Sequence, residues 1–298
     1  MFCYNESYLC RMWHYRMGYK LDLENPRTFN EKLQWLKLHD RKPIYTTMVD
    51  KYVVKSYVAE LIGEKYIIPT LGIWNHFDEI NFDSLPKQFV LKCTHDSGGI
   101  VIIKDKANFD KKAAKNKLEK SLKRNYFWHE REWPYKDVKP RILAEKYMED
   151  VRTTSSDSLL SSSLSSEHML NVYKIFNFMG QPELIQVIQD DKTRHETIDY
   201  FDTNWNLFDL RQNFPNSTVH LKRPEQLEKM LTLAKQLSAE HAFLRTDFYE
   251  INGDVFFSEF TFFSDSGFAA FEPEKWDKTL GDLIILPDDK GKSQGGGS

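Results

Sequence analysis

The chain has 298 residues, 41% of them hydrophobic, and its 41 Lys and Arg against 44 Asp and Glu give a formal net charge of −3. Its 21 Phe, 14 Tyr and 7 Trp can bury a sizeable core, which excludes an intrinsically disordered chain. Because the charge is nearly balanced, we expect no nucleic acid partner and no dedicated binding to anionic membranes. The length allows one large domain with several lobes or two small domains.

The expected cellular setting follows from targeting and cysteine signals. No apolar run approaches the ~20 residues that span a bilayer, and the chain starts without the basic and apolar regions of a secretory signal. The sequence has three cysteines, Cys3, Cys10 and Cys93, and no CxxC pair. Because the number is odd and the spacing is not that of a metal site, neither a disulfide framework nor a thiolate zinc site is expected. We expect a cytoplasmic protein with no transmembrane segment. Peripheral association with membrane machinery through the aromatic N-terminal segment stays open, and the oligomeric state has no readable signal.

Helices and short strands alternate in the first half of the expected structure. Apolar residues that recur every three or four positions predict helices over residues 9–19, 31–39 and 45–62, followed by a highly charged helix over 111–124. Thr28 or Asn30 can cap the second helix, and Gly63 can end the third. Short apolar runs predict strands at 67–68, 88–93, 100–104 and 141–147, with a tight loop over 94–99.

The second half begins with a segment of low complexity. Residues 153–166 are mainly Ser with scattered Leu, so we expect a mobile loop there. Strands are expected at 173–178 and 183–189, and an amphipathic helix at 224–240. The final strands, 243–250 and 255–263, are expected to form a hairpin around Asn252 and Gly253, and residues 291–298 have the composition of a flexible linker.

Most familiar enzyme signatures are missing. The sequence has no GxxxxGK[ST], no GxGxxG after a strand, no HExxH and no GxSxG. It also lacks the D-x-D with which many nucleotide-sugar transferases hold a metal. The function therefore has to be argued from constellations of residues rather than from one motif.

The most informative constellation is the acidic hairpin near the C-terminal end. Strand side chains alternate between faces, and a three-residue loop over 251–253 would pair Glu250 with Asp254. This register puts four polar side chains on one face, while the other face is nearly all apolar: Arg245, Asp247, Glu259 and Thr261. Two carboxylates and an arginine on a strand surface suit a divalent metal bound to phosphate. The alternatives are a two-residue loop, which would split the two acids, and a solvated face with an Arg–Glu pair.

A second constellation is basic. Lys92 ends an apolar strand just before the glycine loop Ser97-Gly98-Gly99, where a lysine and loop amides can hold phosphates. Lys51 can add a second positive charge from a helix, and His95 offers either a phosphate contact or a structural hydrogen bond. The alternative is that the glycines only close a hairpin and that both lysines are surface residues.

These segments, in this order, resemble the ATP-grasp superfamily. Within it the sequence is similar to the TupA-like ATP-grasp family, which is found in bacterial surface-polysaccharide gene clusters. The resemblance covers roughly residues 23–287 and is carried by residues 25–37, Asp50-Lys51-Tyr52, 89–92 with His95, Ser97-Gly98, Ser258-Glu259-Phe260-Thr261 and Ser266-Gly267.

The resemblance implies an α+β protein with the ATP-grasp fold, in which two α/β lobes with antiparallel sheets clamp the nucleotide. The expected organisation, in chain order, is an N-terminal helical segment (1–46), the linker helix and small lobe with the glycine loop (47–148), the mobile Ser-rich loop (149–170), the large lobe with the metal site (171–287) and a flexible tail (288–298).

The resemblance also implies roles for individual residues. ATP would be held by Lys51, Lys92, His95, Ser97, Gly98 and Gly99, with the adenine at Glu145, Lys146 and Tyr147. Mg²⁺ would be held by Asp247, Glu259 and Thr261, while Arg245 and Lys92 would act in catalysis. Thr261 replaces an Asn of many ATP-grasp ligases, and Val172 replaces an acidic residue suited to the ribose. The resemblance places Ser266 and Gly267 at the substrate, and loop residue Arg194, with His195, is a further candidate for an anionic acceptor or a solvated turn.

The implied activity is that of a carboxylate–amine ligase that uses ATP and Mg²⁺. An acyl phosphate would be captured by an amine, and the substrate would be a small molecule or saccharide acceptor, such as a uronic acid or amino acid of a cell-surface polymer. Three alternatives stay open: a glycosyltransferase, against which the missing D-x-D argues, an ATP-dependent sugar kinase, and a nucleotide-binding module without catalysis.

Overall fold

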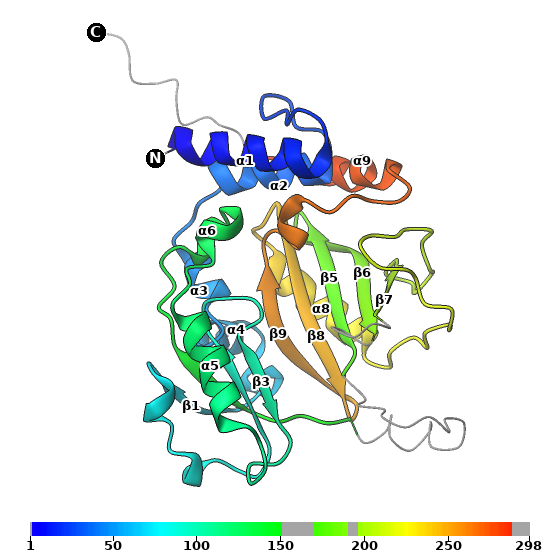
Figure 1. The fold of residues 1–298 in the computed structure, drawn as a ribbon. Coiled ribbons are helices and arrows are strands. Elements are labelled where there is room, and N and C mark those ends of the chain that lie inside the picture. Colours follow the sequence, from blue (N-terminus) through cyan, green and yellow to red (C-terminus); the bar gives the residue numbers. More distant parts are fainter. Residues whose placement is uncertain (1, 151–169, 190–195, 288–298) are drawn as a thin grey trace.

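The computed structural model describes residues 2–150, 170–189 and 196–287, and within them two antiparallel sheets stand side by side (Figure 1). This architecture of two lobes agrees with the α+β class expected from the sequence. The predicted Ser-rich loop, the predicted tail and the candidate residues Arg194 and His195 lie outside the described residues.

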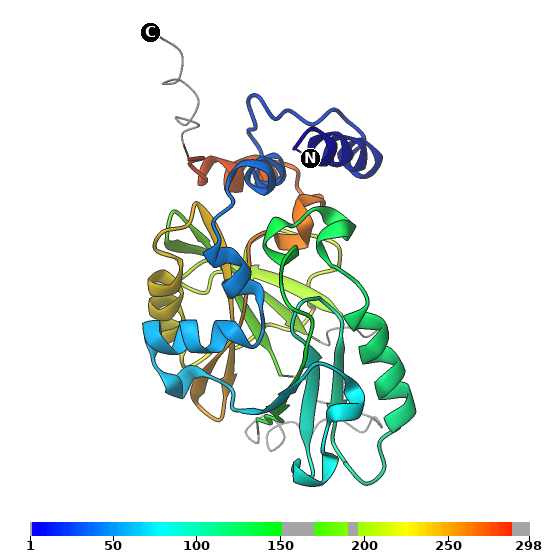
Figure 2. The same ribbon diagram turned by 90° about the vertical axis from the view of Figure 1, so that its left-hand side faces the viewer.

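The small sheet forms the core of the first lobe. Its strand order is β1-β4-β2-β3, and the strands are β1 (Thr70–Trp74), β2 (Phe89–Cys93), β3 (Ile100–Ile103) and β4 (Ile142–Lys146). Helix α5 (Lys111–Leu122) packs against it (Figure 2). Its Ala114 and Leu118 are buried in a cluster with Phe89. Two short 3₁₀ turns complete this lobe: η2 (Phe77–Glu79) and η3 (Phe82–Ser84).

The large sheet forms the second lobe. Its order is β7-β6-β5-β8-β9, and the strands are β5 (Val172–Phe178), β6 (Gln181–Gln189), β7 (Thr197–Phe201), β8 (Phe243–Ile251) and β9 (Asp254–Thr261). Helix α8 (Leu227–Ser238) covers one face with a buried stripe that includes Met230 and Leu237. The opposite face carries the polar side chains described below.

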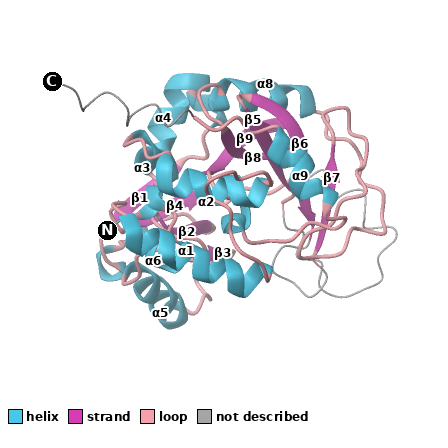
Figure 3. Ribbon diagram, turned by 90° about the horizontal axis from the view of Figure 1, so that it is seen from above, coloured by secondary structure: helices cyan, strands magenta, loops and turns pink. Residues whose placement is uncertain are grey.

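Three helices come from the two ends of the chain: α1 (Phe2–Met17), α2 (Phe29–His39) and α9 (Lys275–Asp282). Helices α2 and α9 lie over one end of the large sheet, and α1 packs against α2 (Figure 3). Helix α2 starts with the predicted cap, because the Thr28 hydroxyl accepts from the Glu31 amide and the Glu31 carboxylate accepts from the Thr28 amide. The Phe29 ring then packs against the aromatic rings of the sheet and of the segment before α9: Phe176, Phe178, Phe243 and Phe271.

The single helix predicted over 45–62 is wrong, because the chain breaks it at Asp50. The two pieces are α3 (Ile44–Val49) and α4 (Val53–Ile62). Asp50 adopts an extended conformation, its carboxylate accepts from the Tyr52 and Val53 amides, and it also pairs with Arg141 at 2.7 Å. The break therefore caps α4 and leaves Lys51 beside the loop that follows β2, where its amide donates to the Thr94 carbonyl.

Other elements differ in detail from the prediction. The strand expected at 67–68 is only an isolated bridge from Ile67 to Phe257, whereas β1, β7 and α9 were not predicted. The remaining short elements are α6 (Phe127–Glu130), η1 (Glu64–Tyr66), η4 (Trp133–Tyr135) and η5 (Ser264–Gly267). Across the described ranges, no helix combines the length and the apolar character that crossing a membrane requires.

Substitution of Phe29 tests how much the packing of α2 on the large lobe contributes to the stability of the protein. The variant Phe29→Ala should lower the free energy of unfolding by about 3–5 kcal/mol, because it opens a cavity among four aromatic rings. Tyr15→Ala removes an aromatic ring of α1 that is 84% exposed and should change stability by less than about 0.5 kcal/mol. Urea denaturation measures both, and equal losses would contradict this packing.

Candidate active site

The β8–β9 hairpin reaches the expected polar face by a different register. The turn has two residues, Asn252 and Gly253, with φ of 55° and 87°, and Ile251 pairs with Asp254. The predicted three-residue loop is therefore wrong. A β-bulge between the pairs Phe248–Phe257 and Asp247–Glu259 leaves Ser258 as the extra residue and shifts the register by one.

The bulge brings the two acids to the same face. Asp247 lies directly opposite Glu259, whereas without the bulge the same turn would place it opposite Ser258, and Arg245 lies opposite Thr261. On the neighbouring strand β5, Lys174 lies opposite Asp247. The polar face, as we call this set, consists of Lys174, Arg245, Asp247, Glu259 and Thr261.

An arginine lies between the two carboxylates of the polar face. Nε and Nη2 of Arg245 each donate to one oxygen of Asp247 at 2.8 Å, and Nη2 is 3.9 Å from Glu259 Oε1. Lys174 Nζ is 3.9 Å from Asp247 Oδ2. Asp247 is buried, while the Glu259 side chain is 38% exposed. The acids are thus held in place by cations and one of them is accessible.

Glu259 is strongly acidic in this setting. Burial raises its pKa, but four cations outweigh that effect and lower the pKa of Glu259 to about 2: Lys51, Arg245, Lys174 and Lys92. Glu259 is therefore ionised at neutral pH and available as an anionic ligand.

Lys51 joins the two lobes. Its Nζ donates to the Asp96 carbonyl at 2.9 Å and lies 3.6 Å from Glu259 Oε2. The same lysine therefore contacts the loop of the small lobe and the polar face of the large lobe.

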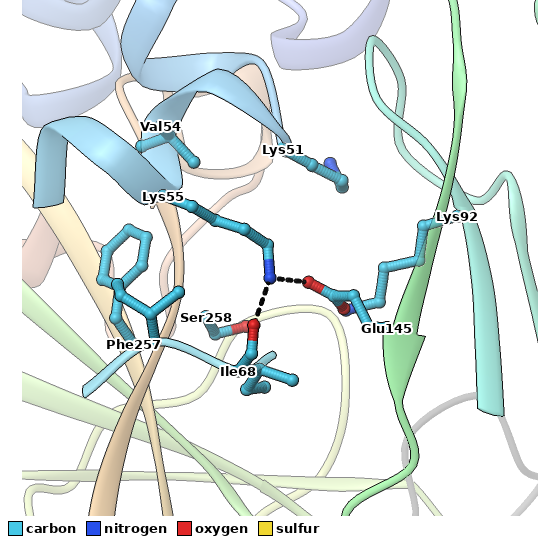
Figure 4. Close-up of a pocket in the computed structure, with 9 residues that line it drawn as sticks. Lys51, Val54, Lys55, Ile68, Lys92, Glu145, Phe257 and Ser258 are labelled. Carbon is cyan, nitrogen blue, oxygen red and sulfur yellow. Dashed lines mark hydrogen bonds and ion pairs between the residues drawn. The ribbon is translucent and has the colours of Figure 1, made fainter. Parts of the chain in front are cut away.

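A second group of charges lies on the small lobe beside Lys51. The Glu145 carboxylate, on β4, contacts Lys55 Nζ at 2.5 Å and Lys92 Nζ at 2.6 Å, and Lys55 also donates to the Ile68 carbonyl at 2.6 Å (Figure 4). Although burial raises the pKa of Glu145, the two ammonium groups lower it below its usual range. We call Lys55, Glu145 and Lys92 the lysine–glutamate triad.

The triad occupies the position predicted for adenine. Val54, Ile68 and Phe257 form an apolar wall beside it, and the pocket between them has room for little more than one water molecule. Lys146 is exposed and Tyr147 half-buried where β4 ends. In this conformation the side chain of Glu145 is engaged by lysines.

The glycine loop has the predicted shape, and its members differ in exposure. Ser97 and Gly98 are exposed, and Gly98 has a φ of 99°, which favours glycine. Gly99 is buried, and a Cβ there would meet the Asp96 carboxylate and the Ser121 hydroxyl within 2.7 Å. His95 is buried, and its Nε2 donates to the carbonyls of Ser121 and Arg124 at 3.2 and 3.0 Å, which is a structural role.

A cavity of about 420 Å³ lies over the polar face. The two lobes and α1 contribute to its lining, which includes Lys51, Ser97, Lys174, Arg245, Glu259 and Thr261, and, from other segments, Arg16, Tyr126, Glu132, Tyr135 and Ser266. Its volume is within the ~300–1,000 Å³ of small-molecule sites. Gly267 does not line it, but its carbonyl accepts from Gln34 at 2.7 Å and shapes the turn that carries Ser266.

The donor set of the polar face fits Mg²⁺. Glu259 and the Thr261 hydroxyl line the cavity as candidate oxygen ligands, and Asp247 lies opposite Glu259 with both of its oxygens accepting from Arg245. Mg²⁺ is usually held by one or two carboxylates together with water and phosphate oxygens. Among the described residues, no three or more His, Cys, Asp or Glu side chains gather as a metal cage. A site that relies on phosphate oxygens needs no such cage.

The sequence interpretation missed Lys174, Glu132 and the tyrosines of the cavity. For Lys174 a signal was present, since a lysine in the apolar run between Tyr173 and Ile175 needs a partner if its face is buried. Glu132 had no comparable signal, because its surroundings come from segments distant in sequence.

The family model described as TupA-like ATPgrasp matches residues 31–285. The chain belongs to the TupA-like ATP-grasp family. The resemblance seen in the motifs is thereby confirmed, and the two antiparallel sheets are the lobes of an ATP-grasp fold. Helix α1, which supplies Arg16 to the cavity, precedes the matched region.

Solved structures similar to this TupA-like protein include D-alanine–D-alanine ligase from Bacillus anthracis complexed with ATP. The sequence identity is 18% and the TM-score 0.43, and the match covers 80% of this chain and 64% of the ligase chain. The D-alanine–D-alanine ligase from Helicobacter pylori has 13% identity, a TM-score of 0.41 and coverages of 80% and 60%. The chain thus spans about 64% and 60% of these two ligases. Likeness at this level carries no argument about activity. No curated protein matches the chain.

The two ion pairs of the lysine–glutamate triad predict how a change at Glu145 alters the stability of the protein. Glu145→Gln should lower the free energy of unfolding at neutral pH by about 3–5 kcal/mol, because it leaves two buried ammonium groups without their counter-ion. The folded-state pKa of Glu145 lies below its unfolded value, so its contribution is present above that value and is lost as the pH falls through the folded-state pKa.

Urea denaturation at neutral and acid pH measures this effect. The difference between wild type and Glu145→Gln should shrink in acid, whereas Glu183→Gln, a change at an exposed residue, should be near neutral at both. A difference that grows in acid would contradict the triad.

Proposed function

We propose that the protein is an ATP- and Mg²⁺-dependent ligase that joins a carboxylate to an amine through an acyl phosphate. The observation that carries the proposal is the polar face, where Glu259 and Arg245 line one cavity together with Lys51, Lys51 Nζ lies 3.6 Å from Glu259, and Asp247 fixes Arg245 from behind. Membership of the TupA-like ATP-grasp family supports the nucleotide as ATP. In this proposal the protein acts in the cytoplasm on small-molecule or saccharide substrates.

Asp247, Glu259 and Thr261 would hold Mg²⁺, which when bound neutralises phosphate charge and aligns the triphosphate. Lys51 and the amides of the Ser97–Gly99 loop would bind the phosphates, because the lysine lies beside both the loop and Glu259. The wall of Val54, Ile68 and Phe257 has the apolar character that an adenine ring needs, and the pocket beside it would have to widen to admit the ring, because it has room for about one water molecule.

The lysine–glutamate triad has a place in this scheme. Lys92 is held by Glu145 at the edge of the nucleotide site, so the positive charge is positioned before a phosphate arrives. When an anion enters, Lys92 can exchange part of its contact with Glu145 for the anion, while Lys55 keeps the carboxylate paired. Binding of adenine along Glu145, Lys146 and Tyr147 then uses the backbone of that strand.

Arg245 would stabilise the transferring phosphoryl group. Its guanidinium is fixed by two hydrogen bonds to Asp247 and reaches toward Glu259, so its charge is preorganised at the face of the cavity. Phosphoryl transfer requires little covalent chemistry from the protein, and positioning and charge neutralisation should supply most of the rate. The substrate carboxylate attacks the γ-phosphorus, and ADP leaves.

The acyl phosphate would then react with an amine in the same cavity, which releases phosphate and gives an amide. The family's setting, as the motifs imply it, favours a uronic acid or an amino acid of a bacterial surface polymer such as a capsule, an O-antigen or a teichuronopeptide. The products separate this reaction from its alternatives. A ligase frees ADP and phosphate, a sugar kinase leaves the phosphate on its product, and a glycosyltransferase releases the nucleotide of a sugar donor without using ATP.

Glu259 is the residue on which the proposal is tested. Glu259→Gln should reduce ADP release in the presence of Mg²⁺ and pooled uronic and amino acids by about 10²–10³-fold, because a charge that stabilises the metal and phosphates is lost. The control Asp254→Asn, on the exposed tip of the same hairpin, should keep the wild-type rate. Full turnover by Glu259→Gln would overturn the assignment of the polar face.

A further inference from the structure

The cavity wall contains a buried carboxylate that the scheme above does not use. Glu132 lies between α6 and η4, is 5% exposed and lines the same cavity as Arg245 and Glu259. A buried carboxylate is costly unless its surroundings compensate it, so its contacts decide what it can do.

Glu132 is held by the turn that carries the predicted substrate residue Ser266. The Ser266 hydroxyl donates to Glu132 Oε1, and Ser266 adopts a φ of 52°. Lys37, which is fully buried in α2, donates from Nζ to the Ser266 carbonyl at 2.8 Å and to the Glu130 carbonyl at 3.0 Å. One buried ammonium group therefore ties together the two backbone segments that position Glu132.

The charges around Glu132 come from several elements. Those that face it are Lys37 of α2, Glu130 of α6, Arg245 of β8 and the phenols of Tyr126 and Tyr135, with Arg16 of α1 paired to Glu130 at 2.5 Å. Burial raises the pKa of Glu132 to about 7, although Lys37 and the Ser266 hydroxyl act in the opposite direction. A carboxyl of this kind can both accept and release a proton near neutral pH.

We propose that Glu132 binds the acceptor of the reaction as a primary ammonium group and takes its proton. This inference rests on the proposed function, which supplies the acyl phosphate. The amine nitrogen freed in this way forms the C–N bond, the C–O bond to phosphate breaks, and the phosphate leaves with the electron pair. One ammonium proton goes to Glu132 and the second leaves with the phosphate, so charge and atoms balance.

Glu132 is favoured over the other carboxylates of the cavity for this role. Glu259, which lines the cavity, is assigned to the metal and is too acidic to retain a proton. Asp265, which also lines it, accepts hydrogen bonds from Asn213 at 3.1 Å and Ser264 at 3.3 Å. Glu130 is paired with Arg16. Among the described carboxylates that line the cavity, Glu132 is the one that is buried in its wall, held by the Ser266 hydroxyl, and whose pKa burial raises, which suits a proton acceptor.

The test uses two nucleophiles that differ in their need for a base. The reaction contains ATP, Mg²⁺, a pool of glucuronate, galacturonate and glutamate, and glucosamine as a second amine. Hydroxylamine traps an acyl phosphate as hydroxamate without having to lose a proton before it attacks, because it is mostly neutral near neutral pH. Glutamate and glucosamine arrive as ammonium ions. Glu132→Gln should retain hydroxamate formation and lose amide formation by about 10²-fold, the usual size of a general-base effect.

The outcomes separate the two proposals. Wild type that forms neither hydroxamate nor amide overturns the proposed function and this inference with it. If wild type forms hydroxamate and amide, and Glu132→Gln forms the two at unchanged rates or at rates reduced by the same factor, this inference alone is overturned. Asp199→Asn removes another buried carboxylate whose pKa burial raises, outside the cavity, and should leave both reactions at the wild-type rate.

The pH dependence of amide formation is a second readout, and it allows a second variant, Ser266→Gly, to be tested. Amide formation by wild type should rise with pH through about 7, as Glu132 loses its proton, and Glu132→Gln should lack this limb. Ser266→Gly accepts the positive φ and removes the hydroxyl that lowers the pKa of Glu132, so the rise of amide formation should move to higher pH, a shift that the profile shows whatever the absolute rate of the variant. A limb that stays in place in Ser266→Gly would count against Glu132 as its source.

Discussion

The structure of the cavity depends on one constraint, which is that a buried carboxylate must be compensated by a cation or by hydrogen bonds. Asp247 meets it through two hydrogen bonds from Arg245, and this pair fixes the guanidinium at the face of the large sheet. Lys51 and Lys174 extend the same compensation to Glu259 and Asp247. Charges that a nucleotide would use are thus already held in place by one another.

The same constraint organises the small lobe and the wall of the cavity. Glu145 is compensated by two lysines, and Glu132 by a serine hydroxyl and a buried lysine, yet the outcome for the proton differs. Two direct ion pairs lower the pKa of Glu145, while burial prevails at Glu132 and raises its pKa. One kind of side chain therefore serves as a fixed anion in one place and as a proton carrier in another.

One face of the large sheet carries aromatic residues that pack against α2 at one end and charged residues that border the cavity at the other. Phe176 lies opposite Arg245 and Phe178 opposite Phe243, so aromatic and charged residues share a face by strand alternation. The aromatic end is covered by Phe29 of α2, and the charged end borders the cavity. The four residues that the sequence predicted for the polar face do share one face, but Lys174 was missed. The sequence could not predict how they meet, because a β-bulge at Ser258 compensates for the shorter turn.

The sequence by itself determined the chemical inventory and the local order: the acids and arginine of the hairpin, the lysine before the glycine loop, the capping box of α2 and the family that their spacing indicates. These follow from periodicity and local hydrogen bonding, which act over a few residues. Only the tertiary structure decided which charges meet. Lys174 opposite Asp247, Glu145 between two lysines and Glu132 beside Ser266 join segments far apart in the chain, and such pairs are selected by the cost of burying charge in a packed fold.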